Sequence, residues 1–199
     1  MAELYNGGLT REQLLFYEIR IVASLESRGL ERDEIRRKIR DDNLFQFPTE
    51  KMVDSITNTC FKRIDALGSE SLIDNLASGT IESAKQTNLY AMMKYNRIVW
   101  DFMITVIGEK YRIHDFDFSQ KDLNLFFHRL QEQDDNVASW SDSTIQKIKQ
   151  VLKKSLIECD YLDSTRSEKL NQILITPELE DGIREKHDLA ALPAFNCFM

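Results

Sequence analysis

Apolar residues recur with a period near 3.6 along nearly the whole chain, which is the spacing of one face of an α-helix. Little interrupts this pattern, because only seven glycines and three prolines occur among 199 residues. A chain with so few turn-forming residues favours long helices over strands and tight turns. The sequence therefore predicts an all-α, mainly helical protein.

Capping residues divide the pattern into separate helices. Thr10, Thr49 and Ser119 are expected to begin helices, and Gly29 and Gly68 to end them. A polar loop is expected over 131–139, and a short last helix opens at Pro177. The other expected helices cover residues 10–27, 31–41, 50–67, 69–79, 81–94 and 97–112, followed by one from Ser119 and one from Asp142 or Ser143. Trp100 is expected to be buried at the centre of the core.

Two domains are expected. Residues 1–68 predict a helix-turn-helix-like N-terminal domain, although its 42–48 connection is longer than the usual turn of three or four residues. Residues 69–199 predict a second helical domain. Near its end, Tyr161–Leu162 and Gln172–Ile175 are expected to be short extended runs joined by a polar turn. A short β-hairpin wing at 161–175 would give this domain the outline of a winged helix.

A lysine-rich helix precedes the expected wing. The stretch 144–157 contains four lysines and no acid, in a chain whose net charge is −7. At about 100° per residue, its apolar stripe is Ile145, Ile148, Leu152 and Leu156. The lysines flank that stripe on both sides, and two glutamines point outward. A polyanionic partner explains this pattern, and so does a solvated surface helix whose lysines only maintain solubility.

A second basic surface is expected in the N-terminal third, where arginines recur every four residues from Arg32 to Arg40. Small polar and basic residues also share an outward stripe of the following helix, as phosphate contact requires. The alternative is a solvated face, with i,i+4 pairs between Asp33 and Arg37 and between Glu34 and Lys38. The candidate nucleic-acid-binding residues of both surfaces are Arg32, Arg36, Arg37, Arg40, Lys51, Ser55, Asn58, Lys62, Gln146, Lys147, Lys149, Gln150, Lys153 and Lys154.

Other function classes find little support. Three distant cysteines without a CxxC spacing indicate neither a zinc knuckle nor a disulfide framework, and Cys60 lies on an apolar stripe. No phosphate-binding, zinc-protease or serine-hydrolase motif occurs. His114, Asp115 and Asp117 form an H-D-x-D pattern that turn chemistry also explains. We therefore expect no catalytic residue, metal or cofactor. Without a signal peptide or membrane-spanning stretch, a soluble cytoplasmic protein is expected.

The order of several sequence blocks resembles the BrxA family of BREX phage-defence systems. Near the start these are Gly8-Leu9, Glu18, Gly29-Leu30, Arg36-Arg37 and Asn43-Leu44. The later blocks are Asp142-Ser143-Thr144, the lysine helix and the Pro177 helix. The resemblance covers nearly the whole chain. It implies a mostly helical accessory BREX protein associated with DNA binding, of a fold also likened to an RNA-binding antitermination factor.

Three functions therefore remain open. The first is a non-catalytic accessory protein that binds double-stranded DNA through its basic helices. The second is a helical scaffold that holds other BREX proteins together, which the apolar tail with Leu192, Phe195 and Phe198 favours. The third is RNA binding in the manner of an antitermination factor. The sequence sets no oligomeric state and does not rank the two basic surfaces.

Overall fold

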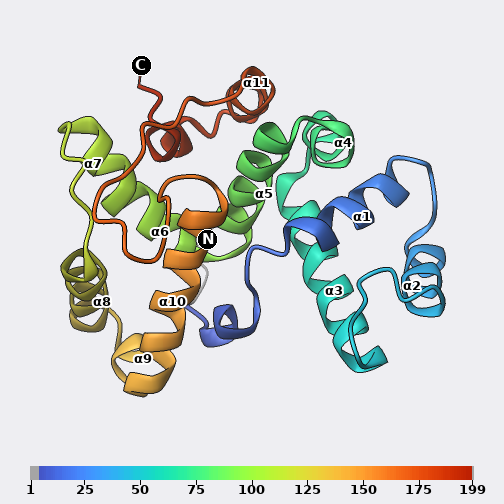
Figure 1. Cartoon of the computed structure of the whole chain (residues 1–199), viewed down its shortest axis with the longest axis horizontal. Helices are drawn as coiled ribbons and strands as arrows, with labels where there is room; N and C mark the ends of the chain where they lie inside the picture. Colours follow the sequence, from blue (N-terminus) through green and yellow to red (C-terminus); the bar gives the residue numbers. More distant parts are fainter. Residues whose placement is uncertain (1–4, 199) are drawn as a thin grey trace. The chain divides into compact units, whose positions relative to one another are not determined.

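The computed structural model describes residues 5–198, and these residues form an all-α fold, as predicted (Figure 1). Within that range no strand forms, and an isolated antiparallel bridge joins Asp117 to Lys169. The chain divides into two compact units. Unit 1 contains the residues up to Gln13, Asn96–Ile175 and the residues from Ile183 onward, and unit 2 contains Leu14–Tyr95 and Thr176–Gly182. These units have other bounds than the expected domains 1–68 and 69–199, and that expected division stays a prediction.

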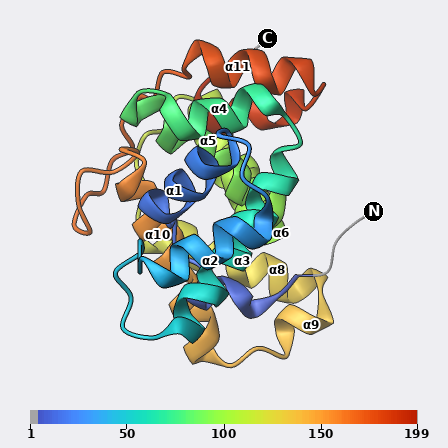
Figure 2. The ribbon, with the colours of Figure 1, turned by 90° about the vertical axis from the view of Figure 1, so that its right-hand side faces the viewer.

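Unit 2 is built from α1 (Phe16–Glu26), α2 (Arg32–Asp41), α3 (Glu50–Leu67), α4 (Glu70–Ser78), α5 (Ile81–Tyr95) and the first turns of α11 (Pro177–Glu185). Figure 2 shows α1–α4 of this unit from a second direction. The predicted ends of α3 are confirmed: Thr49 Oγ1 accepts the Met52 N–H at 3.3 Å, and Gly68 has a left-handed φ of 55°.

A buried polar cluster attaches α11 to α4 and α5. The Asn75 amide on α4 donates to the hydroxyls of Ser83 and Thr87 on α5, each at 2.8 Å. Ser83 Oγ also lies 3.0 Å from Thr176 Oγ1, immediately before α11, and donates to Glu178 at 3.2 Å. Because buried polar groups need such partners, this cluster fixes the first turn of α11 within unit 2.

The predicted first helix, from Thr10 to Ser27, is interrupted. Gly7–Arg11 form a 3-10 helix, η1, in unit 1, and α1 begins only at Phe16, after Leu15 adopts a left-handed φ of 56°. Two buried side chains cause the break, because Arg63 Nη1 and Asn88 Nδ2 donate to the Leu14 carbonyl at 2.7 and 2.8 Å. The expected Thr10 cap is therefore wrong.

Unit 1 contains α6 (Arg97–Phe102), the π-helical segment η2 (Met103–Gly108), α7 (Glu109–Arg112), α8 (Gln120–Gln133), α9 (Asp135–Ala138), α10 (Asp142–Glu158) and η3 (Leu189–Phe195). The Ser119 cap is confirmed as part of a capping box with Asp122. The expected loop at 131–139 is wrong, because Asp134 Oδ1 accepts the Val137 N–H at 3.0 Å and begins α9. Trp100 is only partly buried, whereas Phe102 is fully buried.

The hairpin wing predicted at 161–175 is absent. Tyr161 and Leu162 are buried, and Tyr161 Oη donates to the Ala194 carbonyl at 3.0 Å. The chain instead pairs with the loop before α8: the Leu170 N–H donates to the Phe116 carbonyl at 2.7 Å, and the Phe118 N–H to the Glu168 carbonyl at 2.9 Å. Backbone groups bonded in this way are not available for a hairpin ladder.

The apolar tail folds onto unit 1. Leu192 and Phe195 in η3 are buried, whereas Phe198 remains 42% exposed. The burial of these two side chains removes most of the apolar surface that favoured a scaffold function. In the part of the chain that the structure describes, no helix combines the length and hydropathy needed to span a membrane.

Candidate nucleic-acid interface

The lysine helix α10 has the predicted orientation. Ile145, Ile148, Leu152 and Leu156 are buried on one face. Its N-cap is Ser141, one residue earlier than expected, whose hydroxyl accepts the Thr144 N–H at 3.3 Å. Acidic residues occur only at the two ends of the helix, Asp142 and Glu158. The exposed face between them therefore contains only basic and neutral side chains.

Two of the four lysines on α10 have partners within unit 1. Lys149 Nζ donates to Asn124 Oδ1 on α8 at 2.9 Å and lies 5.4 Å from the Phe127 ring centre. Burial against α8 lowers the pKa of Lys149 below its ordinary value. Lys154 donates to Gln13 and lies 3.5 Å from the Glu158 carboxylate. The ammonium groups of both lysines therefore already have contacts within unit 1.

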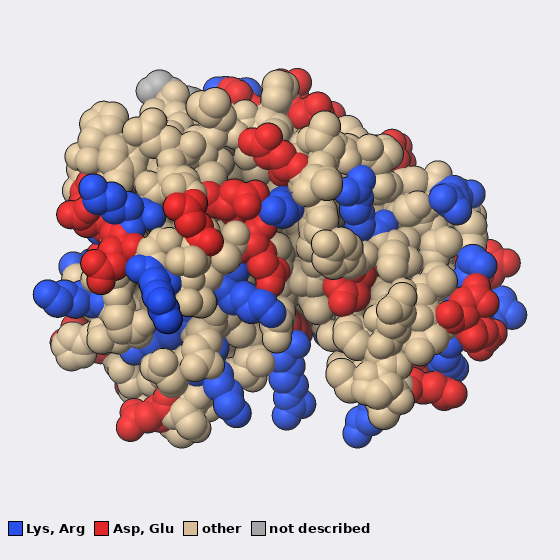
Figure 3. Space-filling model, in the orientation of Figure 1, with Lys and Arg blue, Asp and Glu red and all other residues tan. Residues whose placement is uncertain are grey.

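The other two lysines, the exposed Lys147 and the partly exposed Lys153, have no carboxylate partner among the described residues. Among residues 5–198, neither Lys147 nor Lys153 forms an ion pair or side-chain hydrogen bond, and Gln146 and Gln150 are exposed beside them. In Figure 3 basic side chains gather over the surface where Figure 1 draws α8 and α10, while acidic side chains gather above them. This face combines cations with amide donors, both of which are groups that contact phosphate backbones.

The arginine column of α2 has a different environment, because each arginine contacts α3. Arg32 pairs with Asp65, with its guanidinium 4.9 Å from the Phe61 ring centre. Arg36 donates to Asn58 and lies 5.0 Å from the same ring centre. Arg40 pairs with Asp54 at 2.8 Å. The column therefore joins α2 to α3, and the two carboxylates offset much of its charge.

The remaining candidates on α2 and α3 are less constrained. Arg37 contacts the carbonyl of Asp33 at 3.4 Å instead of its carboxylate, and Lys38 pairs with Asp42, so the expected i,i+4 pairs are wrong. Glu34 instead accepts the Glu31 N–H as part of a capping box. The exposed residues of the α3 stripe are Lys51, Ser55 and Lys62, the last 6.0 Å from the Tyr95 ring centre.

We predict that Arg36→Ala with Arg40→Ala leaves affinity for duplex DNA within about twofold of wild type, because these guanidiniums already contact α3. The melting temperature should fall slightly as the contacts between α2 and α3 are lost. Parallel anisotropy titrations and thermal melts measure both effects. A large loss of affinity at an unchanged melting temperature would assign DNA contact to the column.

The H-D-x-D turn contacts the side chain of a lysine that precedes it. Lys110 Nζ lies 2.9 Å from the Asp115 carboxylate, 3.0 Å from that of Asp122 and 2.6 Å from the Asp117 carbonyl. Burial disfavours the charge of Lys110, but its hydrogen bonds to Asp115 and Asp122 outweigh this and raise its pKa. Between residues 5 and 198, no three His, Cys, Asp or Glu residues gather as metal ligands would.

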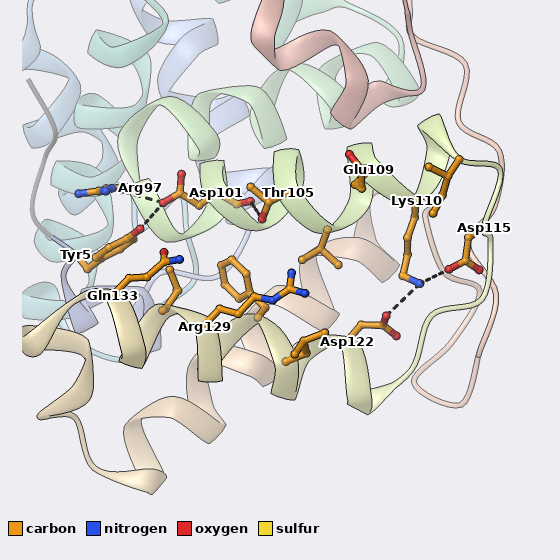
Figure 4. A pocket seen from close by; sticks show the side chains of 15 residues that line it. Tyr5, Arg97, Asp101, Thr105, Glu109, Lys110, Asp115, Asp122, Arg129 and Gln133 are labelled. Carbon is orange, nitrogen blue, oxygen red and sulfur yellow. Dashed lines mark hydrogen bonds and ion pairs between the residues drawn. The ribbon is translucent and has the colours of Figure 1, made fainter.

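Close to this turn, a groove of about 530 Å³ lies between α8 and the α6–η2–α7 run (Figure 4). At one end Tyr5 Oη donates to Asp101 at 2.6 Å, and burial together with that carboxylate raises the pKa of Tyr5 to about 12. Arg129 of α8 lies in the groove and has no hydrogen bond or ion pair to a described residue. Sequence analysis missed this groove, because its lining residues come from separate elements with no common spacing.

The fold and this surface define an all-helical protein with a solvent-facing lysine-rich helix. The BrxA family model matches residues 3–187, and the chain therefore belongs to the BrxA family. A Bacillus cereus (strain H3081.97) protein named BREX protein BrxA is 32% identical over 187 residues, which cover 94% of this chain and 93% of the relative. A protein of the same name from Escherichia coli O9:H4 (strain HS) is 25% identical, covering 87% of this chain and 81% of its own length.

A solved structure supports the fold. The crystal structure of an uncharacterized protein from Magnetospirillum magneticum matches with a TM-score of 0.80 and 22% identity. The match covers 96% of this chain and 97% of that chain. At this identity the likeness shows the fold alone.

Proposed function

We propose that this chain is a non-catalytic component of a BREX phage-defence system that binds double-stranded DNA through the exposed face of α10. The observation that carries the proposal is the pair Lys147, which is exposed, and Lys153, which is partly exposed. Neither has a carboxylate partner among the described residues, and the acids of their helix lie only at its ends. An acidic chain with a net charge of −7 binds DNA only if its cations are grouped on one surface.

Lys147 and Lys153 serve best as phosphate contacts, because an ammonium on a flexible stem binds phosphate as a point charge. Gln146 and Gln150 are exposed beside them and offer amide groups to sugar, phosphate or base edges. Arg37, Lys51, Ser55 and Lys62 form a secondary surface whose exposed groups add non-specific attraction. Arg32, Arg36 and Arg40 already contact α3 and contribute least to DNA affinity. Lys149 and Lys154 contribute once they exchange their present partners for phosphate groups.

Duplex DNA is favoured over duplex RNA by groove shape. The major groove of B-form DNA is about 12 Å wide and admits an α-helix, whereas that of A-form RNA is deep and narrow. A single basic helix such as α10 suits the former. The name of the relatives, BREX protein BrxA, further supports other BREX proteins as partners.

The proposal predicts that the protein binds duplex DNA and neither cleaves it nor hydrolyses ATP. A labelled duplex of about 20 base pairs should bind at low salt with similar affinity whatever its sequence, and more tightly than an RNA duplex of equal length. Incubation with magnesium or manganese and ATP should give neither cut DNA nor ADP. The proposal fails if the duplex does not bind at low salt, or if wild-type protein cleaves it and Asp115→Ala abolishes the cleavage.

A further inference from the structure

A second surface of the molecule combines an exposed aromatic ring with cations, and it belongs to unit 2. A hollow of about 430 Å³ lies at the surface formed by α1, α2 and their neighbouring loops. Tyr17 lines it together with three basic residues, Arg20, Arg28 and Lys38. Ile21 and Leu44 are among its apolar residues, and no Asp or Glu lines it.

The ring of Tyr17 is the most unusual feature of this hollow. Its side chain is 77% exposed, although an aromatic side chain gains most when it is buried. The neighbouring Phe16 meets it edge to face, with ring centres 5.5 Å apart, which restricts the orientation of the Tyr17 ring. A partly oriented, exposed ring next to apolar side chains provides a stacking platform for a flat ligand.

The charges around the ring indicate that the flat ligand is anionic. Arg28 has no side-chain partner among the described residues. Arg20 donates to the Gly79 carbonyl at 2.9 Å, and this contact leaves its positive charge uncompensated. Lys38 pairs with Asp42 at 2.9 Å, and both side chains are about half exposed. The lining therefore has three cations, of which one is paired with a carboxylate.

From this combination we infer that the hollow binds an unpaired segment of single-stranded nucleic acid, with one base stacked on Tyr17 and the adjacent phosphates held by Arg28, Arg20 and Lys38. Its volume lies within the usual range for small-ligand sites, so it suits one nucleotide at a time. Bases within a duplex are stacked on one another and do not reach such a ring. An acidic peptide would use the cations but would leave the ring without a function. The inference uses other residues than the duplex site on α10 and does not rest on it.

The test uses anisotropy titrations of the full-length chain with labelled oligo(dT) and with an abasic oligomer of the same length. To exclude contacts with α10, the titrations are repeated in a Lys147→Glu/Lys153→Glu background. Oligo(dT) should bind more tightly than the abasic oligomer in both backgrounds. Tyr17→Ala should weaken oligo(dT) binding by about 5- to 150-fold, as expected for loss of one stacked base, and Tyr17→Phe by less than about twofold.

Arg28→Ala should make the salt dependence for the single strand shallower by about 0.7, the amount lost with one phosphate contact. Matched controls are Leu174→Ala, which removes an equally exposed apolar side chain in unit 1, and Arg166→Ala, which removes an exposed arginine from a loop of unit 1. Both controls should bind like their parent protein.

Three results would overturn the inference. The first is equal binding of the abasic oligomer and oligo(dT), since the ring would then have no role. The second is unchanged oligo(dT) binding by Tyr17→Ala. The third is displacement of oligo(dT) by an equal concentration of polyglutamate, which would make an acidic peptide the better occupant. None of these depends on whether duplex DNA binds α10, so the two proposals fail separately.

Discussion

Replacing Arg63 by alanine should destabilise the protein by about 3–5 kcal/mol, enough to unfold a marginally stable unit. Arg63 is fully buried on α3, and its guanidinium donates to the Leu14 carbonyl, where the chain turns into α1 through a left-handed residue. The substitution leaves a large cavity and removes one of the two donors that hold this turn. Circular dichroism during thermal or urea denaturation measures the loss.

A matched substitution distinguishes the effect of losing a buried side chain from the effect of losing a positive charge. Arg37→Ala also removes an arginine from a helix of unit 2, but Arg37 is exposed and contacts only a backbone carbonyl. Its effect on the free energy of unfolding should stay within about 0.5 kcal/mol. If Arg63→Ala melts cooperatively at nearly the wild-type temperature, the buried anchor at Leu14 does not hold α1.

The second large effect is expected at α10. Lys147→Glu with Lys153→Glu should weaken duplex binding about 60-fold at 0.1 M salt. Each phosphate contact changes log K by about 0.9 for a tenfold change in salt, so at 0.1 M each contact adds about 0.9 to log K relative to 1 M salt, and loss of two contacts removes about 1.8. Both side chains lie outside the buried stripe, so helicity and melting should not change. Anisotropy titrations with one labelled duplex measure the affinity.

A control with the same change in net charge distinguishes local contact from overall repulsion. Arg166→Glu with Lys169→Glu reverses two exposed cations on the loop after α10. This variant should retain nearly the wild-type affinity. Equal weakening by both double variants would mean that net charge, and not the α10 face, governs binding.

Local sequence signals predicted the helices well. The buried stripe of α10, the Thr49 and Ser119 caps and the Gly68 end of α3 depend on neighbours within a few residues, and all are confirmed. Helix period and capping chemistry act over this short range. For the same reason, the four lysines of α10 were found from their spacing alone.

The errors arose where distant residues decide the structure. Arg63 and Asn88 interrupt the predicted first helix from 49 and 74 residues away. The predicted wing is replaced by backbone pairing with residues 116–118. The arginine column was recognised as cationic, but its partners lie on α3, outside the helix that the pattern describes. Tyr17 lies outside the apolar stripe of its own helix, and this position was the only feature of the sequence that pointed to an exposed ring.

The most direct measurement of the central claim is the salt dependence of duplex affinity for wild type and for Lys147→Glu/Lys153→Glu. A plot of log K against log salt concentration should be steep and linear for wild type, with a slope of about −0.9 for each phosphate contacted. The double variant should be shallower by about 1.8, which is 0.9 for each of the two lost contacts. A flat wild-type plot, or identical slopes for the two proteins, would contradict DNA binding through α10.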